Sequence, residues 1–248
     1  KELQKLHQQS KPFIAYIETS SNHMPFTVPD KKGSYKPLKE EEISKELLEK
    51  SGFKSVAQIN ALRYLDFNID LFLKRAKKAG YYDNTIFLFF GDHNTAMNPV
   101  DFLTKEESAL GTVVHHVPFF IHAPKFTKTK VVSRFTKLVD LMPTAASLAN
   151  INYTNYTLGS NALDSVQATD FAFLYLAIKG EPALGILKNN YYYTLTTVTN
   201  SANLYDFNGE DLTDIRKDYP TITKQMDSLL RGYYNATKYL YYNNKKIK

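Results

Sequence analysis

The stretch TIFLFFGDH at residues 85–93 decides the fold class. Its first six residues favour β structure and are apolar on both faces, which is typical of a central parallel strand covered by helices on both sides. Gly91 then ends the run and permits a sharp backbone turn. Ligands of open α/β sheets collect at the carboxyl ends of the strands, where Asp92 and His93 follow. The stretch therefore predicts an α/β fold with a candidate site directly after one strand.

Strand and helix patterns alternate on both sides of this stretch. Residues 12–18 (PFIAYIE) and 117–122 (VPFFIH) are short apolar runs typical of buried strands. Helical periodicity occupies residues 55–80 and 135–149. The intervening residues 25–54 are rich in Pro, Lys and Glu and predict a surface excursion with one short helix. Strand, helix and strand in alternation predict an α/β sheet.

The pattern changes after about Leu163. Residues 185–197 (GILKNNYYYTLTT) predict a hairpin, residues 204–207 a short strand, and the residues from Pro220 onward an amphipathic helix. We therefore expect two domains. Residues 1–165 would form an α/β core, and residues 166–248 a subdomain with an antiparallel hairpin and a terminal helix.

The amino-acid composition limits the kinds of site and partner that the chain can have. The chain has 248 residues, 43% of them hydrophobic, which suffices for a buried core. The absence of cysteine excludes disulfides, a thiolate metal site and a cysteine nucleophile. The net charge of +6 suits an anionic substrate or a membrane surface, and no nucleic-acid motif occurs, so we expect no nucleic-acid partner. No apolar run reaches the roughly 18 residues of a membrane span. The opening residues resemble the middle of a protein, so we expect a fragment.

A carboxylate beside an imidazole, as in Asp92 and His93, suits a divalent metal such as zinc or manganese. Taken alone, however, the tripeptide fits a strand-ending turn with solvated side chains better. His23 stands in the same position after the predicted strand at 12–18. It could bind a metal, contact a phosphate oxygen or protonate a leaving group. The plainer alternative is a loop histidine that hydrogen-bonds to the backbone.

The pair His115 and His116 precedes the predicted strand at 117–122. If all strands were parallel, the pair would lie at the opposite edge from Asp92, whereas an antiparallel strand would bring it to the same edge. We expect His122 to be structural. The string Gly-x-Ser-x-Gly is absent, so Ser/His/Asp catalysis has no local support.

Six segments also occur in a recognisable order. They are 11–26 (KPFIAYIETSSNHMPF); 64–66 (YLD) with 80–86 (GYYDNTI) and 91–93 (GDH); 117–121 (VPFFI); 140–144 (DLMPT); 158–163 (LGSNAL); and 204–206 (LYD). Together they resemble the C-terminal portion of lipoteichoic acid synthase-like proteins of the sulfatase and alkaline phosphatase superfamily. Asn94 departs from this pattern, because a glycine is common there, and the loop that follows is expected to differ.

The resemblance implies an incomplete α/β fold of this type. It has a mixed, mostly parallel sheet between helices, an antiparallel strand at 117–121, and a small C-terminal antiparallel sheet plus helix. It implies that Asp92 and His93 hold one divalent metal ion (Mn, Mg or Zn). His23 would lie in the substrate pocket, and His116 would reach the same edge as a second catalytic candidate. The nucleophile, usually a threonine, and a further acidic ligand belong to the family's N-terminal half, so the isolated chain is expected to be inactive.

The function implied is that of a metal-dependent phosphotransferase. It would act on lipid-head-group phosphodiesters such as glycerol phosphate, outside the cytoplasm, through a covalent phospho-threonine whose residue lies upstream of this chain. The expected partners are a phospholipid or other anionic ester substrate and a membrane, reached through an N-terminal region. A sulfatase or phosphodiesterase of the same superfamily is the first alternative, and a catalytically silent binding domain is the second.

Overall fold

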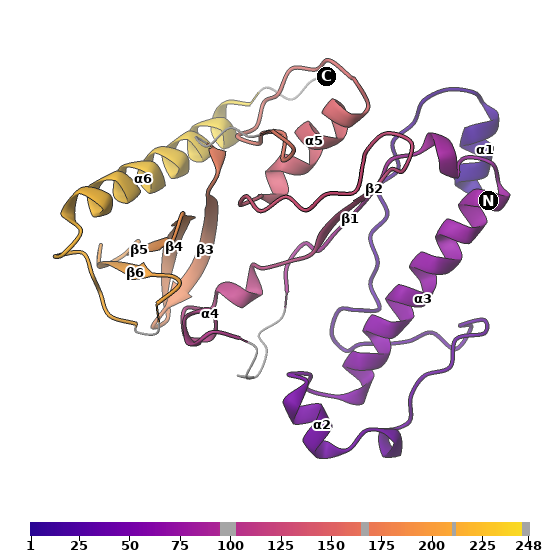
Figure 1. Cartoon of the computed structure of the whole chain (residues 1–248), viewed down its shortest axis with the longest axis horizontal. Helices are drawn as coiled ribbons and strands as arrows, with labels where there is room; N and C mark the ends of the chain where they lie inside the picture. The colour runs from indigo at the N-terminus through magenta and orange to yellow at the C-terminus, as the bar shows by residue number, and fades with distance from the viewer. Residues whose placement is uncertain (95–102, 165–168, 210–211, 245–248) are drawn as a thin grey trace. The chain divides into compact units, whose positions relative to one another are not determined.

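The computed structural model shows an α/β protein made of two compact units (Figure 1). The residues it describes are 1–94, 103–164, 169–209 and 212–244. The units comprise residues 1–87 with 103 and 123–127, and residues 88–94 with 104–122 and the described residues from 128 onward. The predicted domain boundary between residues 165 and 166 lies outside the described residues and stays a prediction.

Helix α3 (Val56–Lys78) is the longest element of the first unit. Ser55 Oγ accepts a hydrogen bond from Gln58 N at 3.1 Å, which confirms the expected N-cap. Gly80 follows the helix with a φ of +84°, a left-handed conformation that ends a helix at low cost. The shorter helices of this unit are α1 (Glu2–Gln8), η1 (Glu40–Glu42), α2 (Lys45–Lys50) and η2 (Tyr82–Asn84). The short helix expected within residues 25–54 is confirmed, whereas α1 was not predicted.

A buried polar contact ties the excursion at 25–54 to α3. The Asn60 side chain accepts a hydrogen bond from Leu38 N and donates one to Leu38 O, both at 2.8 Å. Tyr35 Oη donates to Asn60 O at 2.8 Å, and the Tyr35 ring lies 5.1 Å from that of Tyr64. Because Asn60 and Tyr35 are both buried, these bonds hold the excursion in one position on the helix.

Strands β1 (Phe87–Phe90) and β2 (Phe119–His122) form a two-stranded sheet, which confirms that the strands near Phe87 and Phe119 share one sheet. Beyond β1, Gly91 N donates to Pro118 O at 3.1 Å, and Asn94 N donates to Val114 O at 2.8 Å. From the first of these bonds to the second, the donor's residue number rises from 91 to 94 while the acceptor's falls from 118 to 114. The two chain segments therefore run in opposite directions, as in an antiparallel pair.

The C-terminal part contains the predicted antiparallel sheet. Strands β3 (Ala172–Ile178), β4 (Glu181–Lys188), β5 (Tyr191–Thr196) and β6 (Ala202–Asp206) are hydrogen-bonded in that order. The β4–β5 hairpin turns at Asn189 and Asn190, and Asn189 adopts a φ of +53°, which asparagine tolerates. The expected hairpin and the strand at 204–207 are confirmed. The sheet begins at Ala172, however, rather than near residue 185 as predicted.

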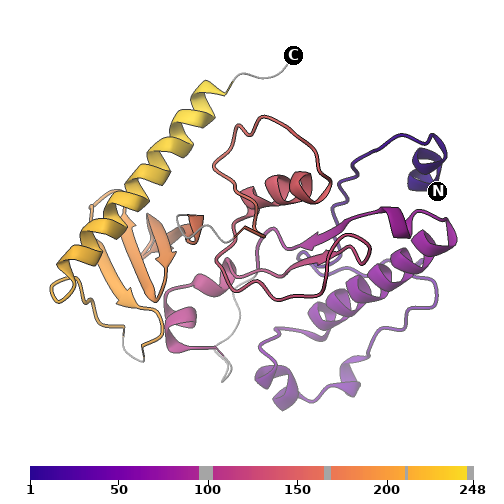
Figure 2. The same ribbon diagram turned by 45° about the horizontal axis from the view of Figure 1, so that its top comes forward.

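Helix α6 (Pro220–Asn243) covers one face of this sheet, as Figures 1 and 2 show. Its Met226 and Leu230 are buried in a cluster with residues of the sheet and its approach, namely Phe171, Leu184, Ile186, Tyr193, Leu195 and Leu204. A smaller cluster contains Leu174, Leu187 and Tyr192. The predicted small antiparallel sheet plus helix is thereby confirmed. Among the helices of the described residues, none combines the length and apolar character needed to cross a bilayer.

Short helices precede and follow β2 along the chain, before the second sheet begins. They are α4 (Lys105–Ala109), η3 (Thr112–Val114) and η4 (Leu138–Asp140), the last continuing into α5 (Leu141–Leu148).

Asp140 is fully buried, and its carboxylate accepts hydrogen bonds from Lys137 N and Ser160 N, both at 2.8 Å. Lys137 Nζ lies 3.3 Å from the same carboxylate and donates to Phe171 O at 3.2 Å. Asp140 and Lys137 together therefore join α5, the segment at 160 and the approach to β3.

The strand predicted at residues 12–18 is not formed, so this prediction was wrong. A strand needs a neighbour that completes its backbone hydrogen bonds. The two sheets of the described residues, β1–β2 and β3–β6, contain no strand that pairs with this segment. Ile14 and Ile17 are 78% and 60% exposed. Within the described residues this apolar run therefore lies outside both sheets.

Candidate metal and catalytic site

Asp92 and His93 stand directly after β1, where the sequence predicted them. His93 N donates to Asp92 Oδ1 at 2.9 Å, and His93 Nε2 lies 3.7 Å from Asp92 Oδ2. His93 Nδ1 lies 3.1 Å from Asn94 O, so a proton on Nδ1 leaves the Nε2 lone pair for a ligand. The side chains of Asp92 and His93 are 75% and 61% exposed. Both can therefore take a ligand without leaving a packed position.

Gly91 permits the close approach of the chain that precedes β2. A Cβ atom at this position would lie 3.0 Å from Val117 Cβ and 3.2 Å from Val117 Cγ1. Most side chains would push the two segments apart and would weaken the hydrogen bond from Gly91 N to Pro118 O. Gly91 thus fixes the position of Asp92 and His93 relative to β2.

Backbone hydrogen bonding places His115 and His116 beside the turn that carries Asp92 and His93. They follow Val114, whose carbonyl oxygen accepts the hydrogen bond from Asn94 N. Because the segments run antiparallel, the histidine pair lies at the same end of β1 as Asp92 and His93. His115 is half-buried, and burial lowers its pKa, whereas His116 is exposed and hence more accessible to a substrate.

The donor pair can be tested for its fit to a divalent metal. Nitrogen and oxygen ligands lie about 2.0–2.2 Å from zinc, so two ligands of one ion are separated by about 3–4 Å. The 3.7 Å between Asp92 Oδ2 and His93 Nε2 agrees with this spacing. Throughout the part of the chain that the structure describes, no three His, Asp or Glu side chains gather as a metal site. The pair fits the ion in kind and spacing, and it supplies two of the four ligands of a tetrahedral site.

His23 lies in a turn of the first unit. Its Nδ1 lies 2.8 Å from Met24 O, and its backbone N donates to Ser20 O at 3.0 Å. His23 is exposed, and its Nε2 is not the ring nitrogen that makes this backbone contact. Its predicted role beside Asp92 stays a prediction, because the two residues belong to different units.

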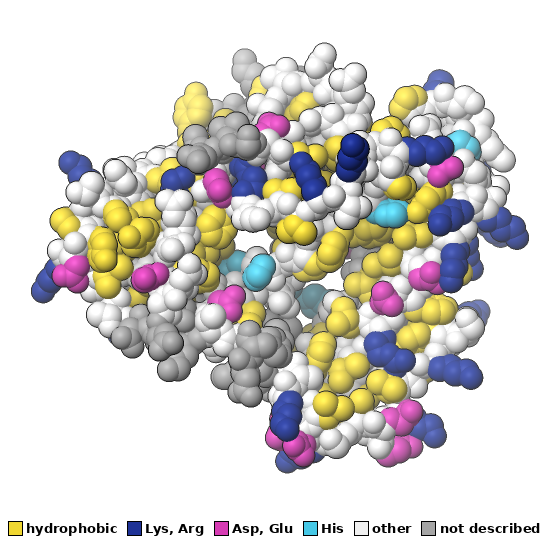
Figure 3. Space-filling view, in the orientation of Figure 1, with side chains coloured by type: hydrophobic (Ala, Val, Ile, Leu, Met, Phe, Trp, Pro, Cys, Tyr) yellow, Lys and Arg dark blue, Asp and Glu magenta, His cyan; other side chains and the backbone are white. Residues whose placement is uncertain are grey.

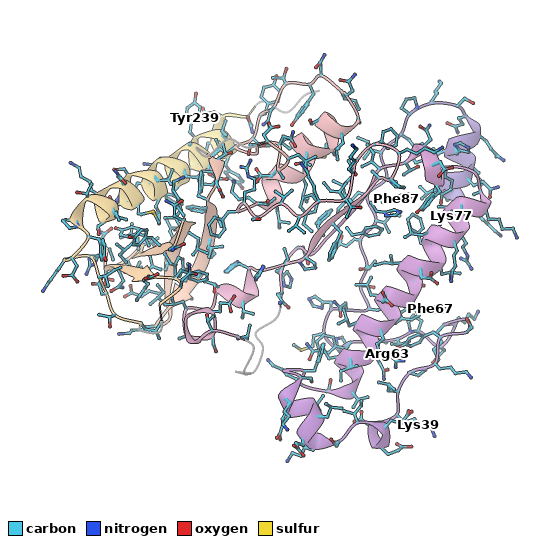
Figure 4. All side chains as sticks on the ribbon, in the orientation of Figure 1. Lys39, Arg63, Phe67, Lys77, Phe87 and Tyr239 are labelled. Carbon is cyan, nitrogen blue, oxygen red and sulfur yellow. The ribbon has the colours of Figure 1, made fainter. Side chains whose placement is uncertain are left out.

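A hollow on α3 was not predicted from the sequence. It has a volume of about 460 Å³ and is lined by residues of α3 and of the excursion, which are Ser34, Tyr35, Lys36, Arg63, Asp66, Phe67 and Asp70. Arg63 and Phe67 are labelled on α3 in Figure 4. Its lining includes the basic side chains Lys36 and Arg63 and the acidic side chains Asp66 and Asp70, and Asp70 is also paired with Lys74 at 2.7 Å. On the visible face in Figure 3, lysine and arginine side chains are scattered rather than gathered in one patch.

Comparison with known proteins places these observations in a family. Residues 1–151 match the family model described as Sulfatase. The chain is 28% identical over 204 residues to lipoteichoic acid synthase-like YvgJ of Bacillus subtilis (strain 168), with 78% of this chain and 30% of that protein covered. It is 30% identical over 161 residues to lipoteichoic acid synthase 1 of the same strain, with 61% and 23% covered. The chain thus spans less than a third of the length of these relatives, and the resemblance expected from the sequence is confirmed.

A solved structure supports the fold. The chain matches yidJ from Bacteroides fragilis with a TM-score of 0.64 at 17% identity, over 96% of this chain and 57% of that one. At this identity the likeness shows the fold alone. Together with the two sheets and the helices, it confirms the incomplete α/β fold of the alkaline phosphatase and sulfatase type.

Proposed function

The chain belongs to the sulfatase family, and we propose that it is part of a metal-dependent phosphotransferase that acts on lipid-head-group phosphodiesters. The observation that carries the proposal is the exposed Asp92–His93 pair after β1, with its two ligand atoms 3.7 Å apart. The similarity to lipoteichoic acid synthases favours a glycerol phosphate or similar unit as the transferred group. The proposed location is outside the cytoplasm, with membrane attachment through a region that precedes these residues.

Four residues of this chain carry the proposed chemistry. Asp92 and His93 hold a divalent ion of the Mn, Mg or Zn kind, and the ion supplies stabilisation of negative charge on the phosphoryl oxygens when bound. An imidazole can accept and donate a proton near neutral pH. His23 is therefore proposed to orient the phosphate or assist the leaving group, and His116 to serve as a second proton carrier.

The proposed reaction has two steps. In the first, the hydroxyl oxygen of an upstream threonine bonds to phosphorus and gives up its proton, while the bond from phosphorus to the diacylglycerol oxygen breaks and that oxygen takes a proton, so that diacylglycerol leaves. In the second, an acceptor hydroxyl bonds to phosphorus and gives up its proton, while the bond from phosphorus to threonine breaks and the threonine oxygen takes a proton. Water in place of the acceptor would give a hydrolase, which is the alternative that the family description favours.

The test uses the full-length protein with a phosphatidylglycerol-type lipid and, separately, a chromogenic sulfate ester. Transfer of glycerol phosphate to an alcohol should be metal-dependent and should fall by about 10³-fold or more in Asp92→Ala and His93→Ala, as when charge-stabilising groups are removed. His7→Ala and Asp30→Ala remove the same side-chain types elsewhere and should leave turnover unchanged.

Three other outcomes would replace the proposal. Release of free product without transfer would make the protein a phosphodiesterase, and turnover of the sulfate ester alone would make it a sulfatase. If the full-length protein binds the lipid without turnover, it is a binding domain.

A further inference from the structure

One edge of the C-terminal sheet is covered and the other is open. The strands are hydrogen-bonded in the order β3-β4-β5-β6, so β3 and β6 are the two edges (Figure 1). The β6 edge is covered because Leu204 N donates to Asp214 Oδ1 at 3.1 Å and Leu204 O accepts from Ile215 N at 2.9 Å. Among the described residues, β3 makes backbone hydrogen bonds with β4 and with no other segment. The β3 edge is therefore the open one.

The register of β3 with β4 identifies the backbone groups that point outward from this edge. Ala177 lies opposite Pro182 of β4. Pro182 has no N–H, and its carbonyl oxygen accepts a hydrogen bond from Thr197 N at 2.9 Å, on the β5 side. The N–H and C=O of Ala177 therefore point away from β4. Because these directions alternate along an antiparallel strand, the same groups of Phe173 and Tyr175 also point outward.

Nothing in the sequence of β3 protects this edge from pairing. Natural edge strands are commonly blunted by charged side chains or by proline. Residues 171–178 (FAFLYLAI) contain neither. Tyr175 is 65% exposed, and Ala177 is exposed as well. An accessible row of outward N–H and C=O groups is a template for a further strand, so the occupant of the edge should be an extended chain segment.

The charges at the two ends of β3 favour a second copy that runs antiparallel. Asp170 precedes the strand and Lys179 follows it. When two copies pair about a two-fold axis at Tyr175, Asp170 of one copy comes next to the position opposite Lys179 of the other. Opposite charges then meet at both ends of the paired strands. A parallel pair in register would instead bring like charges together, which is unfavourable.

We propose that β3 pairs with β3 of a second copy of this chain, antiparallel and about a two-fold axis at Tyr175. The N–H and C=O groups of Phe173, Tyr175 and Ala177 would bond to those of Ala177, Tyr175 and Phe173 of the partner subunit, and the two sheets would become continuous. Association stops at the dimer because the β6 edge is already covered. The proposal does not rest on the proposed reaction, because β3 contains none of the residues assigned to it.

The test is sedimentation equilibrium of the 248-residue chain and of a longer chain that includes the upstream sequence. Both should form dimers. Tyr175→Lys places two like charges opposite each other at the axis and should weaken the dimer about tenfold or more. The matched control Val198→Lys adds the same charge in the turn between β5 and β6, where Val198 is 69% exposed, and should dimerise like the parent. Circular dichroism of each variant checks that the fold is retained.

A second pair of variants tests the charges at the ends of the strand. Lys179→Glu replaces attraction to Asp170 of the partner subunit by repulsion and should weaken the dimer about tenfold at low salt. The effect should shrink as salt is added, because exposed charges are screened. The control Lys128→Glu changes the net charge equally at another exposed position and should leave the dimer unchanged.

Amide hydrogen exchange, followed residue by residue by NMR, locates the interface. The amides of Phe173, Tyr175 and Ala177 should exchange about tenfold more slowly in the concentrated parent than in the dilute parent or in Tyr175→Lys, since pairing removes them from water. The amides of residues 239–242, in the last turns of α6, should exchange at a rate that does not depend on concentration.

Three results would overturn the proposal. The first is a chain that stays monomeric up to about 1 mM, beyond the range of specific association. The second is a dimer that Tyr175→Lys and Val198→Lys affect equally. The third is a longer chain that is monomeric while the amides of Phe173, Tyr175 and Ala177 are protected at every concentration, which would make the upstream sequence the occupant of the β3 edge.

Discussion

Residues 183–187 (ALGIL) of β4 and residues 13–17 (FIAYI) of the first unit are apolar runs of equal length with opposite environments. Ile186 is fully buried between neighbouring strands and α6, whereas Ile14 is 78% exposed. The run in β4 pairs with β3 on one side and with β5 on the other. No strand among the described residues pairs with residues 13–17.

The difference shows what an apolar pattern can and cannot determine. Such a run fits a strand because its side chains pack against cross-strand neighbours, and the same sequence has little preference without them. The β4 run finds its neighbours within about 15 residues along the chain, through two hairpins. Four predictions examine how strongly the packed region depends on its partners, each compared with a control position.

The largest effect is expected for the buried carboxylate of Asp140. Asp140→Ala leaves Lys137 buried without its partner and removes the hydrogen bonds to Lys137 N and Ser160 N. The free energy of unfolding should fall by about 3–5 kcal/mol, as when a buried ion pair loses one member. The matched variant Asp70→Ala breaks the exposed pair with Lys74 and should cost at most about 1 kcal/mol. Urea unfolding followed by circular dichroism measures both, and equal losses would contradict the role of Asp140.

The two apolar runs themselves give the next prediction. Ile186→Ala should lower the free energy of unfolding by about 2–5 kcal/mol, because it leaves a cavity between the sheet and α6. Ile14→Ala removes the same atoms from an exposed position and should change it by less than about 0.5 kcal/mol. A comparable loss in Ile14→Ala would mean that residues 13–17 are packed in solution.

Neighbouring tyrosines on β5 give a smaller contrast. Tyr193 Oη donates to Asp227 Oδ1 of α6 at 2.8 Å, so Tyr193→Phe should cost about 1–2 kcal/mol. The hydroxyl of Tyr192 is buried without a hydrogen-bond partner among the described residues. Tyr192→Phe should therefore leave stability unchanged or raise it slightly. Thermal unfolding of both variants decides the matter, and a larger loss in Tyr192→Phe would reveal a missing partner.

The smallest effect concerns Asp214, which ties the chain before α6 to β6. Burial would raise its pKa, but hydrogen bonds from Arg216 and from Leu204 N hold the pKa below the ordinary 3.8. The folded state therefore holds the charged form more strongly than the unfolded state does. The stabilisation is complete above about pH 4 and is lost as the pH falls through the folded-state pKa.

Asp214→Asn should therefore flatten the dependence of stability on pH below about pH 4, and at neutral pH it should cost no more than about 1 kcal/mol. Acid titration of the parent and the variant at fixed urea measures the difference. Asp30→Asn serves as the exposed control and should leave the dependence of stability on acidic pH unchanged. If the stability of the parent and that of Asp214→Asn fall equally as the pH is lowered, Asp214 does not contribute to the acid dependence of stability.

Local signals explain which elements the sequence could predict. Ser55 and Gly80 mark the ends of α3, Pro220 begins α6, and Asn189 sits at the hairpin turn in a left-handed conformation. Each acts on the residues beside it, so no tertiary information was needed. The missed elements depend on distant partners. They include the buried ion pair of Asp140 and the start of the sheet at Ala172.

The candidate site divides in the same way. The place of Asp92 and His93 directly after a strand could be predicted from adjacent residues, whereas their role as metal ligands came from the family resemblance and stays a prediction. The position of His116 could not be derived from spacing, since it depends on the direction of β2, which the hydrogen bonds of Gly91 and Asn94 reveal. The hollow beside Arg63 needs the fold of residues 34–36 onto α3, and no local pattern predicts that contact.

The most direct test of the proposed site is manganese binding, measured by titration calorimetry on this chain and on a longer chain that includes the upstream sequence. With two ligands from Asp92 and His93, this chain alone should bind weakly, and the longer chain should bind far more tightly. Asp92→Ala should abolish binding in both chains, and Asp30→Ala in neither. Tight binding by the 248-residue chain alone, or binding that survives Asp92→Ala, would contradict the account.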